Sequence, residues 1–266
     1  MSVKPFLPTR RAALAAFAST PALLALSARA FAEDAPKPAP SLKPACTLTP
    51  ASVSGPFYFD PKMVRTDITE NLPGAPMRMR FVVMDAATCT PIPGARVDVW
   101  QTRADGFYSG YPRQGDKRNV DTSGGTFMRG TQFADARGEA SFRGIYPGWY
   151  PGRTPHVHFK VFLDDKDMLT GQMYFPDALS QYIYANVGAY RRKAVRNTFN
   201  GNDELALSDT TRGGFCDIKE ESDHYLATLI IGVSRTAAAV MDDSPTPPIL
   251  PRAIVPGVGP SQQKNG

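Results

Sequence analysis

Short strand-like segments separated by turn residues are the feature that most limits how this chain can fold. Runs rich in β-branched, aromatic and other apolar side chains alternate with Pro-Gly, Asp-Gly and Arg-Gly pairs, which favour turns. The predicted strands are 77–85, 95–101, 140–145, 156–163, 171–175 and 226–234, and one helix is predicted over 177–186, after Pro176. This pattern predicts an all-β fold, an antiparallel β-sandwich with long loops and at most one or two short helices.

The two ends of the chain have compositions of their own. Residues 1–32 combine Arg10-Arg11, a moderately apolar Ala/Leu run and Ala30-Phe31-Ala32, which is the layout of a signal peptide, and the paired arginines favour the twin-arginine route over Sec export. We therefore expect a periplasmic or secreted protein without a membrane anchor. The predicted organisation is a signal peptide over 1–32, a Pro/Ala-rich linker over 33–54, a folded domain over 55–243 and a Pro-rich tail over 244–266.

The basic pI of about 9.1 reflects the signal-like segment rather than the folded domain. Residues 1–32 hold four of the 30 basic side chains and none of the 25 acidic ones, so the remainder is nearly neutral. This balance argues against a nucleic-acid partner and gives no indication of an anionic substrate. An exported chain with three cysteines can form one disulfide, but the sequence does not show which two of Cys46, Cys89 and Cys216 pair.

Two of the three histidines lie in one predicted strand. His156 and His158 are two residues apart, so their imidazoles share one face of the strand, while Val157 and Phe159 point to the other. Such a pair could supply two of the ligands of a metal site. The same pattern is also found where two polar residues lie on a solvated face, and this is the alternative interpretation. His224 stands alone among acidic residues and is interpreted as a surface residue.

Tyrosines follow two of the predicted turns. Tyr108 comes after Asp105-Gly106, and Tyr150 comes after Pro147-Gly148. A phenol ionises near pH 10 and is deprotonated at neutral pH only beside a strong positive charge, which Fe(III) supplies. Two histidines and two tyrosinates therefore suit ferric iron better than zinc, which usually takes a third histidine, a cysteine or a carboxylate.

Several motifs, in the same order, resemble the intradiol ring-cleavage dioxygenases, the family of protocatechuate 3,4-dioxygenase and catechol 1,2-dioxygenase. The resemblance covers roughly residues 55–175 and rests on Gly55-Pro56-Phe57-Tyr58, Val97-Asp98-Val99-Trp100-Gln101, Asp105-Gly106-Phe107-Tyr108, the block 150–159 and Gln172-Met173-Tyr174-Phe175. It implies a prealbumin-like β-sandwich and a non-haem Fe(III) enzyme. Such an enzyme cleaves a catechol-type ring between its two hydroxyl carbons with O2, giving a muconate-type diacid.

The resemblance also implies residue roles. Tyr108 and His156 would be equatorial iron ligands, and Tyr150 and His158 axial ones, with Tyr150 also accepting a substrate proton. Arg153, three residues before His156, is the candidate for stabilising negative charge on the substrate. Gln172 would hydrogen-bond to the substrate or to a hydroxide ligand.

The sequence departs from the family in two ways, and these departures limit which family properties can be expected of this chain. A Pro-rich linker stands where catechol-specific members have a helical dimerisation segment, so a catechol-type dimer is not expected and the oligomeric state stays open. Only five residues separate Tyr150 from His156, so the ring substituents cannot be inferred from relatives. Two alternatives remain: a catalytically silent β-sandwich that binds carbohydrate or protein, and a zinc or ferrous enzyme that uses His156 and His158 with Asp98 or Asp105.

Overall fold

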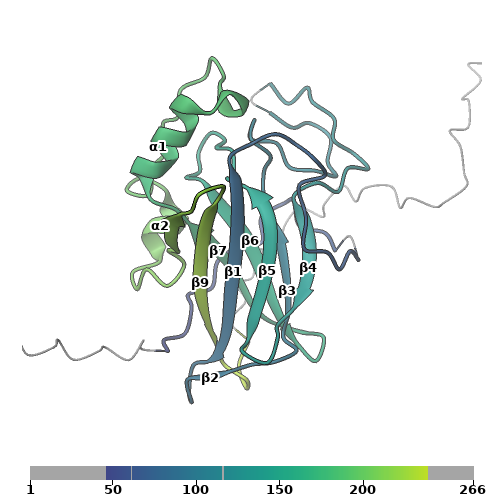
Figure 1. Cartoon of the computed structure of the whole chain (residues 1–266), viewed down its shortest axis with the longest axis vertical. Helices are drawn as coiled ribbons and strands as arrows, with labels where there is room; N and C mark the ends of the chain where they lie inside the picture. The colour runs from purple at the N-terminus through teal and green to yellow at the C-terminus, as the bar shows by residue number, and fades with distance from the viewer. Residues whose placement is uncertain (1–45, 61, 116, 239–266) are drawn as a thin grey trace, which may run out of the picture. The chain divides into compact units, whose positions relative to one another are not determined.

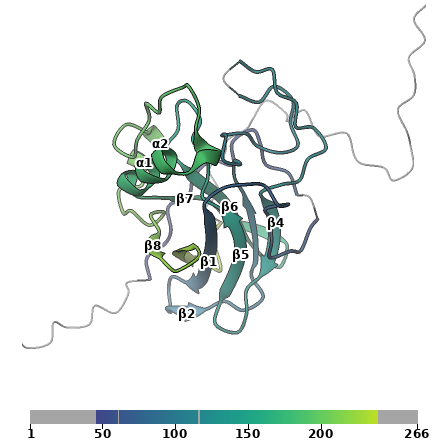
Figure 2. The same ribbon diagram turned by 45° about the horizontal axis from the view of Figure 1, so that its top comes forward.

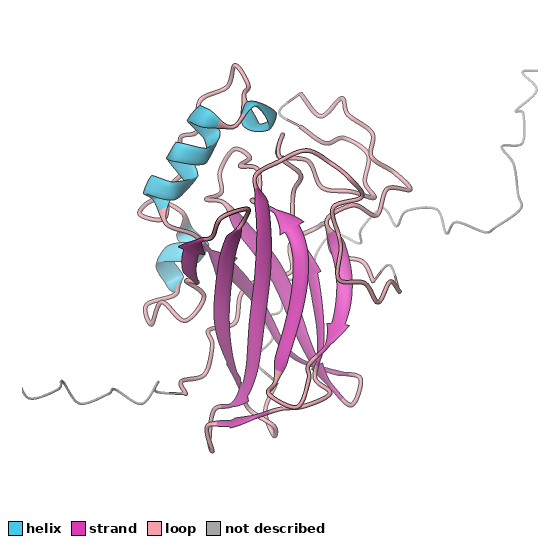
Figure 3. Ribbon diagram, viewed as in Figure 1, coloured by secondary structure: helices cyan, strands magenta, loops and turns pink. Residues whose placement is uncertain are grey.

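A computed structural model of the chain describes residues 46–238 except 61 and 116. Nine strands and three short helical segments make up this part (Figures 1 and 3). The strands are β1 (Pro76–Asp85), β2 (Thr90–Pro91), β3 (Arg96–Trp100), β4 (Arg129–Phe133), β5 (Glu139–Ile145), β6 (His156–Leu163), β7 (Lys166–Tyr174), β8 (Asp217–Glu220) and β9 (Tyr225–Val233). The helical segments are α1 (Asp177–Asn186), the 3-10 turn η1 (Gly188–Tyr190) and α2 (Glu204–Ser208).

The strands form two sheets that pack face to face as a sandwich. One sheet has the order β2-β1-β9-β8 with β5 also paired to β1, and the other has the order β4-β3-β6-β7. The predicted all-β sandwich is thus confirmed. One pairing differs from the antiparallel expectation, because β1 and β9 run parallel. These strands are far apart in the sequence, so no hairpin forces them to be antiparallel.

The core lies between the sheets and follows the alternation of each strand. On β1, Met77, Met79, Phe81 and Val83 are fully buried, while Arg78 and Arg80 between them point outward. On β6, Val157, Phe159 and Val161 complete the core from the other sheet. The remaining face of β6 therefore points away from the core, and it is on this face that His156 and His158 lie.

Long connections gather at one end of the sandwich. The connection between β3 and β4, residues 101–128, extends from the end opposite β2, and α1 begins at that same end (Figure 1). Both helices lie on the side where β7 and β8 are found (Figure 2). The predicted helix agrees with α1, whereas α2, η1, β2, β4 and β8 were not predicted.

The segment 46–54, which the sequence placed in a linker, is part of the folded unit. Its backbone bonds to both sheets: Thr49 N–H donates to Gly232 O on β9 at 2.9 Å, and Ser52 N–H donates to Thr170 O on β7 at 2.9 Å. A disulfide between Cys46 and Cys89 fixes its start. The linker prediction was wrong for these residues because Pro and Ala composition does not reveal such long-range backbone pairing.

Other predicted regions lie outside the described residues, namely the signal peptide, most of the linker and the Pro-rich tail. Within the described residues, no helix has both the length and the apolar character needed to cross a bilayer.

Candidate metal centre

The strand β6 presents both histidines to one buried site. His156 and His158 are only 2% and 3% exposed, so the alternative of two polar residues on a solvated face does not hold. The register pairs His158 with Gln172 of β7 and with Trp100 of β3, and Trp100 stacks flat on the His158 ring at a centroid distance of 4.8 Å. The neighbouring strands thus fix where the imidazoles point.

The two tyrosines reach the same place from loops. Tyr108 lies in the 101–128 connection, where its N–H donates to Gln114 Oε1 at 3.1 Å and its carbonyl accepts from Thr122 Oγ1 at 2.6 Å. Tyr150 lies in a tight turn in which Arg153 N–H donates to its carbonyl. Gly106 lets these loops meet, because a Cβ there would stand 2.2 Å from the carbonyl oxygen of Trp149.

Four donor atoms converge at the centre. From Nε2 of His156, the distances are 3.3 Å to Tyr108 Oη, 3.2 Å to Tyr150 Oη and 3.1 Å to His158 Nε2. Nδ1 of His156 donates to the carbonyl of Thr154 at 2.7 Å, so its Nε2 carries the lone pair. One lone pair cannot satisfy three neighbours as a hydrogen-bond acceptor. Ligand atoms that share a metal at about 2.0–2.1 Å do lie roughly 3 Å apart, so the donor set fits a cation.

The pKa values of the four donor groups decide in which form each of them could ligate a cation. Burial, with the charge of Arg153 adding to it, lowers the pKa of both His156 and His158 well below the ordinary histidine value, so both rings are neutral and able to ligate. Burial raises the pKa of Tyr108 well above its usual value and raises that of Tyr150. Without a cation both phenols therefore stay protonated, and their ionisation requires a strong positive charge among them.

Arg153 is held beside the centre by a buried carboxylate. Its Nε donates to Asp203 Oδ2 at 2.9 Å, and Nη2 donates to Oε1 of Gln172. Asp203 is 1% exposed; its Oδ2 also accepts from Thr154 N–H, while its Oδ1 caps α2 through the N–H groups of Leu205 and Ala206. Sequence reasoning missed Asp203. The motif Asn202-Asp203-Glu204 signals a helix cap, but nothing in it signals a partner 50 positions away.

Gln172 joins this network from β7. It accepts from Tyr174 Oη at 3.0 Å, and its Nε2 donates to the Val53 carbonyl at 3.2 Å. The structure thus brings together the six residues singled out from the sequence: Tyr108, Tyr150, Arg153, His156, His158 and Gln172. His224 lies in the turn between β8 and β9, beside Asp223 at 2.6 Å and apart from this cluster.

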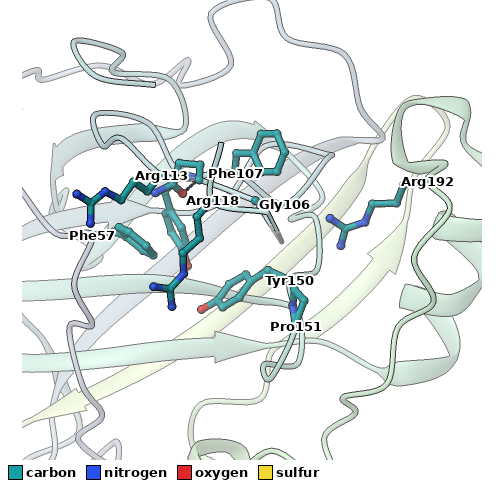
Figure 4. A pocket seen from close by; sticks show the side chains of 11 residues that line it. Phe57, Gly106, Phe107, Arg113, Arg118, Tyr150, Pro151 and Arg192 are labelled. Carbon is teal, nitrogen blue, oxygen red and sulfur yellow. Dashed lines mark hydrogen bonds between the residues drawn. The ribbon is translucent and has the colours of Figure 1, made fainter. Parts of the chain in front are cut away.

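A pocket of about 330 Å³ opens directly onto the two tyrosines (Figure 4). Its apolar walls include Phe57, Phe107 and Pro151, and Phe57 stacks on Tyr108 at a centroid distance of 4.8 Å. The volume falls in the range of small-molecule pockets, about 300–1,000 Å³. An aromatic ring placed there would lie against the tyrosine side of the centre.

The zinc or ferrous alternative requires a third ligand beside the two histidines, and the residues that the structure describes supply none. Across the described residues, no three or more His, Cys, Asp or Glu side chains group as a metal site. Asp98 forms an ion pair with Arg96 and accepts hydrogen bonds from Tyr58 Oη at 2.9 Å and from Thr131 Oγ1 at 2.7 Å. Asp105 pairs with Arg103 at 2.7 Å. Neither carboxylate is available to complete a site with the histidines.

Comparison with known proteins gives a consistent family. The family model Dioxygenase_C, described as "Dioxygenase", matches residues 53–198, a span that includes all four donor residues. Among solved structures, an intradiol ring-cleavage dioxygenase from Tetranychus urticae is similar with a TM-score of 0.65 and 29% identity, over 71% of this chain and 95% of that one.

Two curated proteins match as well. A hydroxyquinol 1,2-dioxygenase from Rhodococcus opacus is 32% identical over 44% of this chain, and a catechol 1,2-dioxygenase from Acinetobacter baylyi is 26% identical over 70% of it. The matches span 42% and 64% of the lengths of these relatives.

Proposed function

Because the chain belongs to the dioxygenase family whose model matches residues 53–198, we propose that it is a non-haem Fe(III) enzyme that opens a catechol-type ring. The ring is cleaved with O2 between its two hydroxyl-bearing carbons, giving a muconate-type diacid. The observation that carries the proposal is the convergence of two phenols and two neutral imidazoles, with Tyr108, Tyr150 and His158 all within 3.3 Å of Nε2 of His156. The pocket beside them has room for an aromatic ring.

Tyr108, Tyr150, His156 and His158 would hold the iron. Bound there, Fe(III) supplies the Lewis acidity that ionises phenols and draws electron density from a catechol, which prepares the ring for O2. Trp100 covers His158 and Phe57 covers Tyr108 with flat aromatic faces, which exclude water from those sides of the centre. Exclusion of water strengthens every electrostatic interaction within the site.

Tyr150 is the residue best placed to take up a substrate proton. It lines the pocket and is half-buried, whereas Tyr108 is 2% exposed. Burial raises the pKa of the Tyr150 phenol in the metal-free site, so the neutral phenol is the favoured form whenever no cation holds its oxygen. A proton received at Tyr150 Oη would leave that side chain neutral and free to move from the centre.

Arg153 supplies the fixed positive charge beside the reacting ring. Its guanidinium is held from two directions, by Asp203 and by Gln172, so its position does not depend on the substrate. A cation that is already oriented stabilises developing negative charge without reorganisation at the moment of reaction. Gln172, held in turn by Tyr174 and Val53, positions this cation.

Export in folded form is part of the same proposal. The signal-like residues 1–32 support it, and the Cys46–Cys89 disulfide suits an oxidising compartment such as the periplasm. A twin-arginine route would let the iron be inserted before translocation.

The direct test is metal content, colour and oxygen uptake of the purified full chain. We expect about one iron per chain, a reddish colour from tyrosinate-to-Fe(III) charge transfer, and O2 consumption with a catechol. Tyr150→Phe should weaken the visible band and lower turnover at least about a hundredfold, because it removes a ligand and a proton acceptor.

The matched control is Tyr146→Phe, at a buried core tyrosine whose hydroxyl bonds to Ser180 at 2.7 Å. It should keep the colour and the activity. A colourless protein that contains a full complement of iron would overturn the proposal, and a Tyr150→Phe variant with full colour and activity would remove Tyr150 from the site.

A further inference from the structure

A buried arginine without a carboxylate partner lies close to the candidate metal centre. Arg129 of β4 is only 1% exposed. Burial lowers the pKa of its guanidinium to about 10, so the group is still cationic at neutral pH. It forms no ion pair with any carboxylate that the structure describes. Since an unpaired buried charge destabilises a fold, an apolar side chain of similar size would fill this space at lower cost.

The sheet places Arg129 on the same face as the two histidines. In the register of the sheet, Arg129 of β4 stands opposite Trp100 of β3, and Trp100 stands opposite His158 of β6. Side chains that stand opposite each other on neighbouring strands point to the same side of a sheet. Since neighbouring strands lie about 4.8 Å apart, the backbone of Arg129 is roughly 10 Å from that of His158. Trp100, which stacks flat on the His158 ring, lies between them.

Hydrogen bonds join Arg129 to the loop that carries Tyr108. Its Nε donates to Ser109 Oγ at 2.8 Å, and its Nη2 donates to the Ser109 carbonyl at 2.7 Å. The guanidinium carbon lies 4.1 Å from the centroid of the Phe59 ring. That ring fills the space beside Gly110, where a Cβ would stand 2.3 Å from a ring carbon. The two residues that follow Tyr108 are thus held by the arginine and by the ring on which the arginine packs.

The charge of Arg129 acts on two of the four donor residues. Burial raises the pKa of the Tyr108 phenol, and Arg129 acts in the opposite direction because its charge stabilises the phenolate. Burial lowers the pKa of His158, and the charges of Arg153 and Arg129 lower it further. The Tyr111 ring, 5.7 Å from the guanidinium, does not cancel this charge, since burial raises the pKa of its phenol and keeps it neutral. Arg129 thus acts on the centre through its charge as well as through its hydrogen bonds.

The other arginine of the centre is neutralised, whereas Arg129 is not. Arg153 pairs with the buried carboxylate of Asp203 at 2.9 Å, so their two charges largely cancel beyond their immediate neighbours. Arg129 keeps its full charge in the buried part of the fold, where solvent and salt screen it little. Of the two arginines, only Arg129 therefore brings an unneutralised charge to the centre.

We propose that Arg129 is a positioning residue of the candidate metal centre: through Ser109 it holds Tyr108 in place, and its positive charge raises the reduction potential of iron bound there. The inference rests on the proposed function of the same site and assigns a role to a residue outside the four donors. A nearby positive charge destabilises Fe(III) more than Fe(II), because the ferric ion carries one more positive charge. For the same reason it strengthens the withdrawal of electron density from a ring at the centre.

The charge is tested by the reduction potential of the iron-loaded full chain, measured by redox titration of its visible band. Arg129→Met removes the charge and keeps an unbranched side chain. It should shift the Fe(III)/Fe(II) equilibrium at least about tenfold toward Fe(III), a fall of about 59 mV for one electron. Arg129→Lys keeps the charge, so its equilibrium should stay within about threefold of the wild type.

The positioning role is tested by the rate at which a chelator removes the iron. Arg129→Lys loses the planar fork that binds both oxygens of Ser109, so iron should leave at least about threefold faster although the potential is kept. An unchanged rate of iron loss in this variant would overturn the positioning role. Should Arg129→Met not fold, Ser109→Asp leaves the arginine in place, gives it a carboxylate partner, and should lower the potential in the same way.

The matched control is Arg65→Met. Arg65 donates from Nε to the backbone carbonyl of Arg129 at 2.8 Å, so the variant disturbs the same strand, but its charge is already paired with Glu70. It should lower the stability of the fold and leave the reduction potential unchanged. A fall in potential equal to that of Arg129→Met would show that disturbance of β4, rather than the charge, is responsible.

These measurements separate the role of Arg129 from ring cleavage. If the iron-loaded chain consumes no O2 with any catechol while the potentials differ as stated, ring cleavage is wrong and the role of Arg129 stands. If catechols are cleaved and Arg129→Met has the potential of the wild type, the charge has no such role and the proposed function stands. Equal falls in Arg129→Met and Arg129→Lys would also overturn the role of the charge.

Discussion

At the scale of single residues, Asp203 joins two structures that the sequence places far apart. One carboxylate oxygen caps α2 through two backbone N–H groups, and the other accepts from Arg153 and from the N–H of Thr154. A group so buried would be costly to leave partly satisfied, and all of its acceptor capacity is used. In the proposed site Asp203 would be a positioning residue, because it would act through Arg153.

Asp203→Asn keeps the shape of the side chain but removes its charge and replaces one acceptor oxygen with a donor. We expect turnover of a catechol to fall at least about tenfold while iron content and visible colour remain, because the four donors are untouched. The free energy of unfolding should drop by about 1–3 kcal/mol from the lost hydrogen bonds. Steady-state oxygen uptake, absorption spectra and urea unfolding would measure these three quantities.

The matched control for Asp203 is Asp209→Asn. Asp209 is also buried and accepts from the backbone N–H groups of Gly213 and Gly214, but it does not contact Arg153. Asp209→Asn should lower the free energy of unfolding by a similar amount and leave turnover nearly unchanged. Equal kinetic losses in both variants would show that Asp203 has only a structural role.

Residue-level prediction from the sequence succeeded where the relevant spacing was local. His156 and His158 share a face because a strand has a period of two, which needs no knowledge of the fold. The grouping of Tyr108 and Tyr150 with them came from the order of family motifs, and their role as ligands stays a prediction. Asp203 and the Cys46–Cys89 pair could not be predicted, because their partners are set by tertiary contacts over 50 and 43 positions.

At the scale of elements, the packing of β6 against β7 on the core side supports the strand whose opposite face carries His156 and His158. Phe159 of β6 is fully buried in the core and stands opposite Gly171 of β7. A Cβ at residue 171 would lie 2.3–2.8 Å from the Phe159 ring, so the ring occupies the space that a side chain would need. Glycine is required here by packing rather than by backbone conformation.

Gly171→Ala should therefore destabilise the fold by about 1–3 kcal/mol through overpacking. Since Phe159 adjoins His158, the variant should also retain iron less well under chelator challenge. Gly188→Ala serves as the comparison, because nothing lies within 4 Å of a Cβ at that position. Thermal unfolding and iron loss over time would measure the effects; an unchanged melting temperature for Gly171→Ala would show that Phe159 can move aside at no cost.

Elements with a strong apolar alternation were predicted nearly to their ends, and those without it were missed. The strands β1, β5, β6 and β9 all carry core residues at every second position. In contrast, β8 has the sequence DIKE, with mostly exposed side chains, and exists because its backbone pairs with β9. The two-residue strand β2 likewise forms because its backbone pairs with β1. Backbone pairing leaves no trace in side-chain patterning.

At the scale of the whole folded unit, the Cys46–Cys89 disulfide closes a loop of 43 positions. This loop contains β1 and the segment 46–57, whose Phe57 stacks on Tyr108. In the chain-entropy account, a cross-link of this span reduces the freedom of the unfolded chain and contributes about 2–4 kcal/mol. The third cysteine, Cys216, is half-buried, and burial raises the pKa of its thiol to about 12, which keeps it unreactive at neutral pH.

Replacing both Cys46 and Cys89 with serine should lower the free energy of unfolding by about 2–4 kcal/mol, measured by urea titration under oxidising conditions. Cys216→Ala, which removes a thiol but no cross-link, should cost clearly less. Stability of the double variant equal to that of the oxidised wild type would mean that the disulfide adds nothing to the fold.

The segment 46–57 touches β9 through Thr49, β7 through Ser52 and the candidate iron ligand Tyr108 through Phe57. During synthesis these residues leave the ribosome before any of their partners, and Thr49 must wait for a strand 183 positions later. Contacts between residues so far apart in the sequence form slowly. We therefore expect the segment 46–57 to form its native contacts among the last, although it is synthesised before the rest of the described fold. Until Phe57 is seated, the side of Tyr108 that it covers would remain open, and this would give a metal ion an interval in which to enter before the protein closes around it.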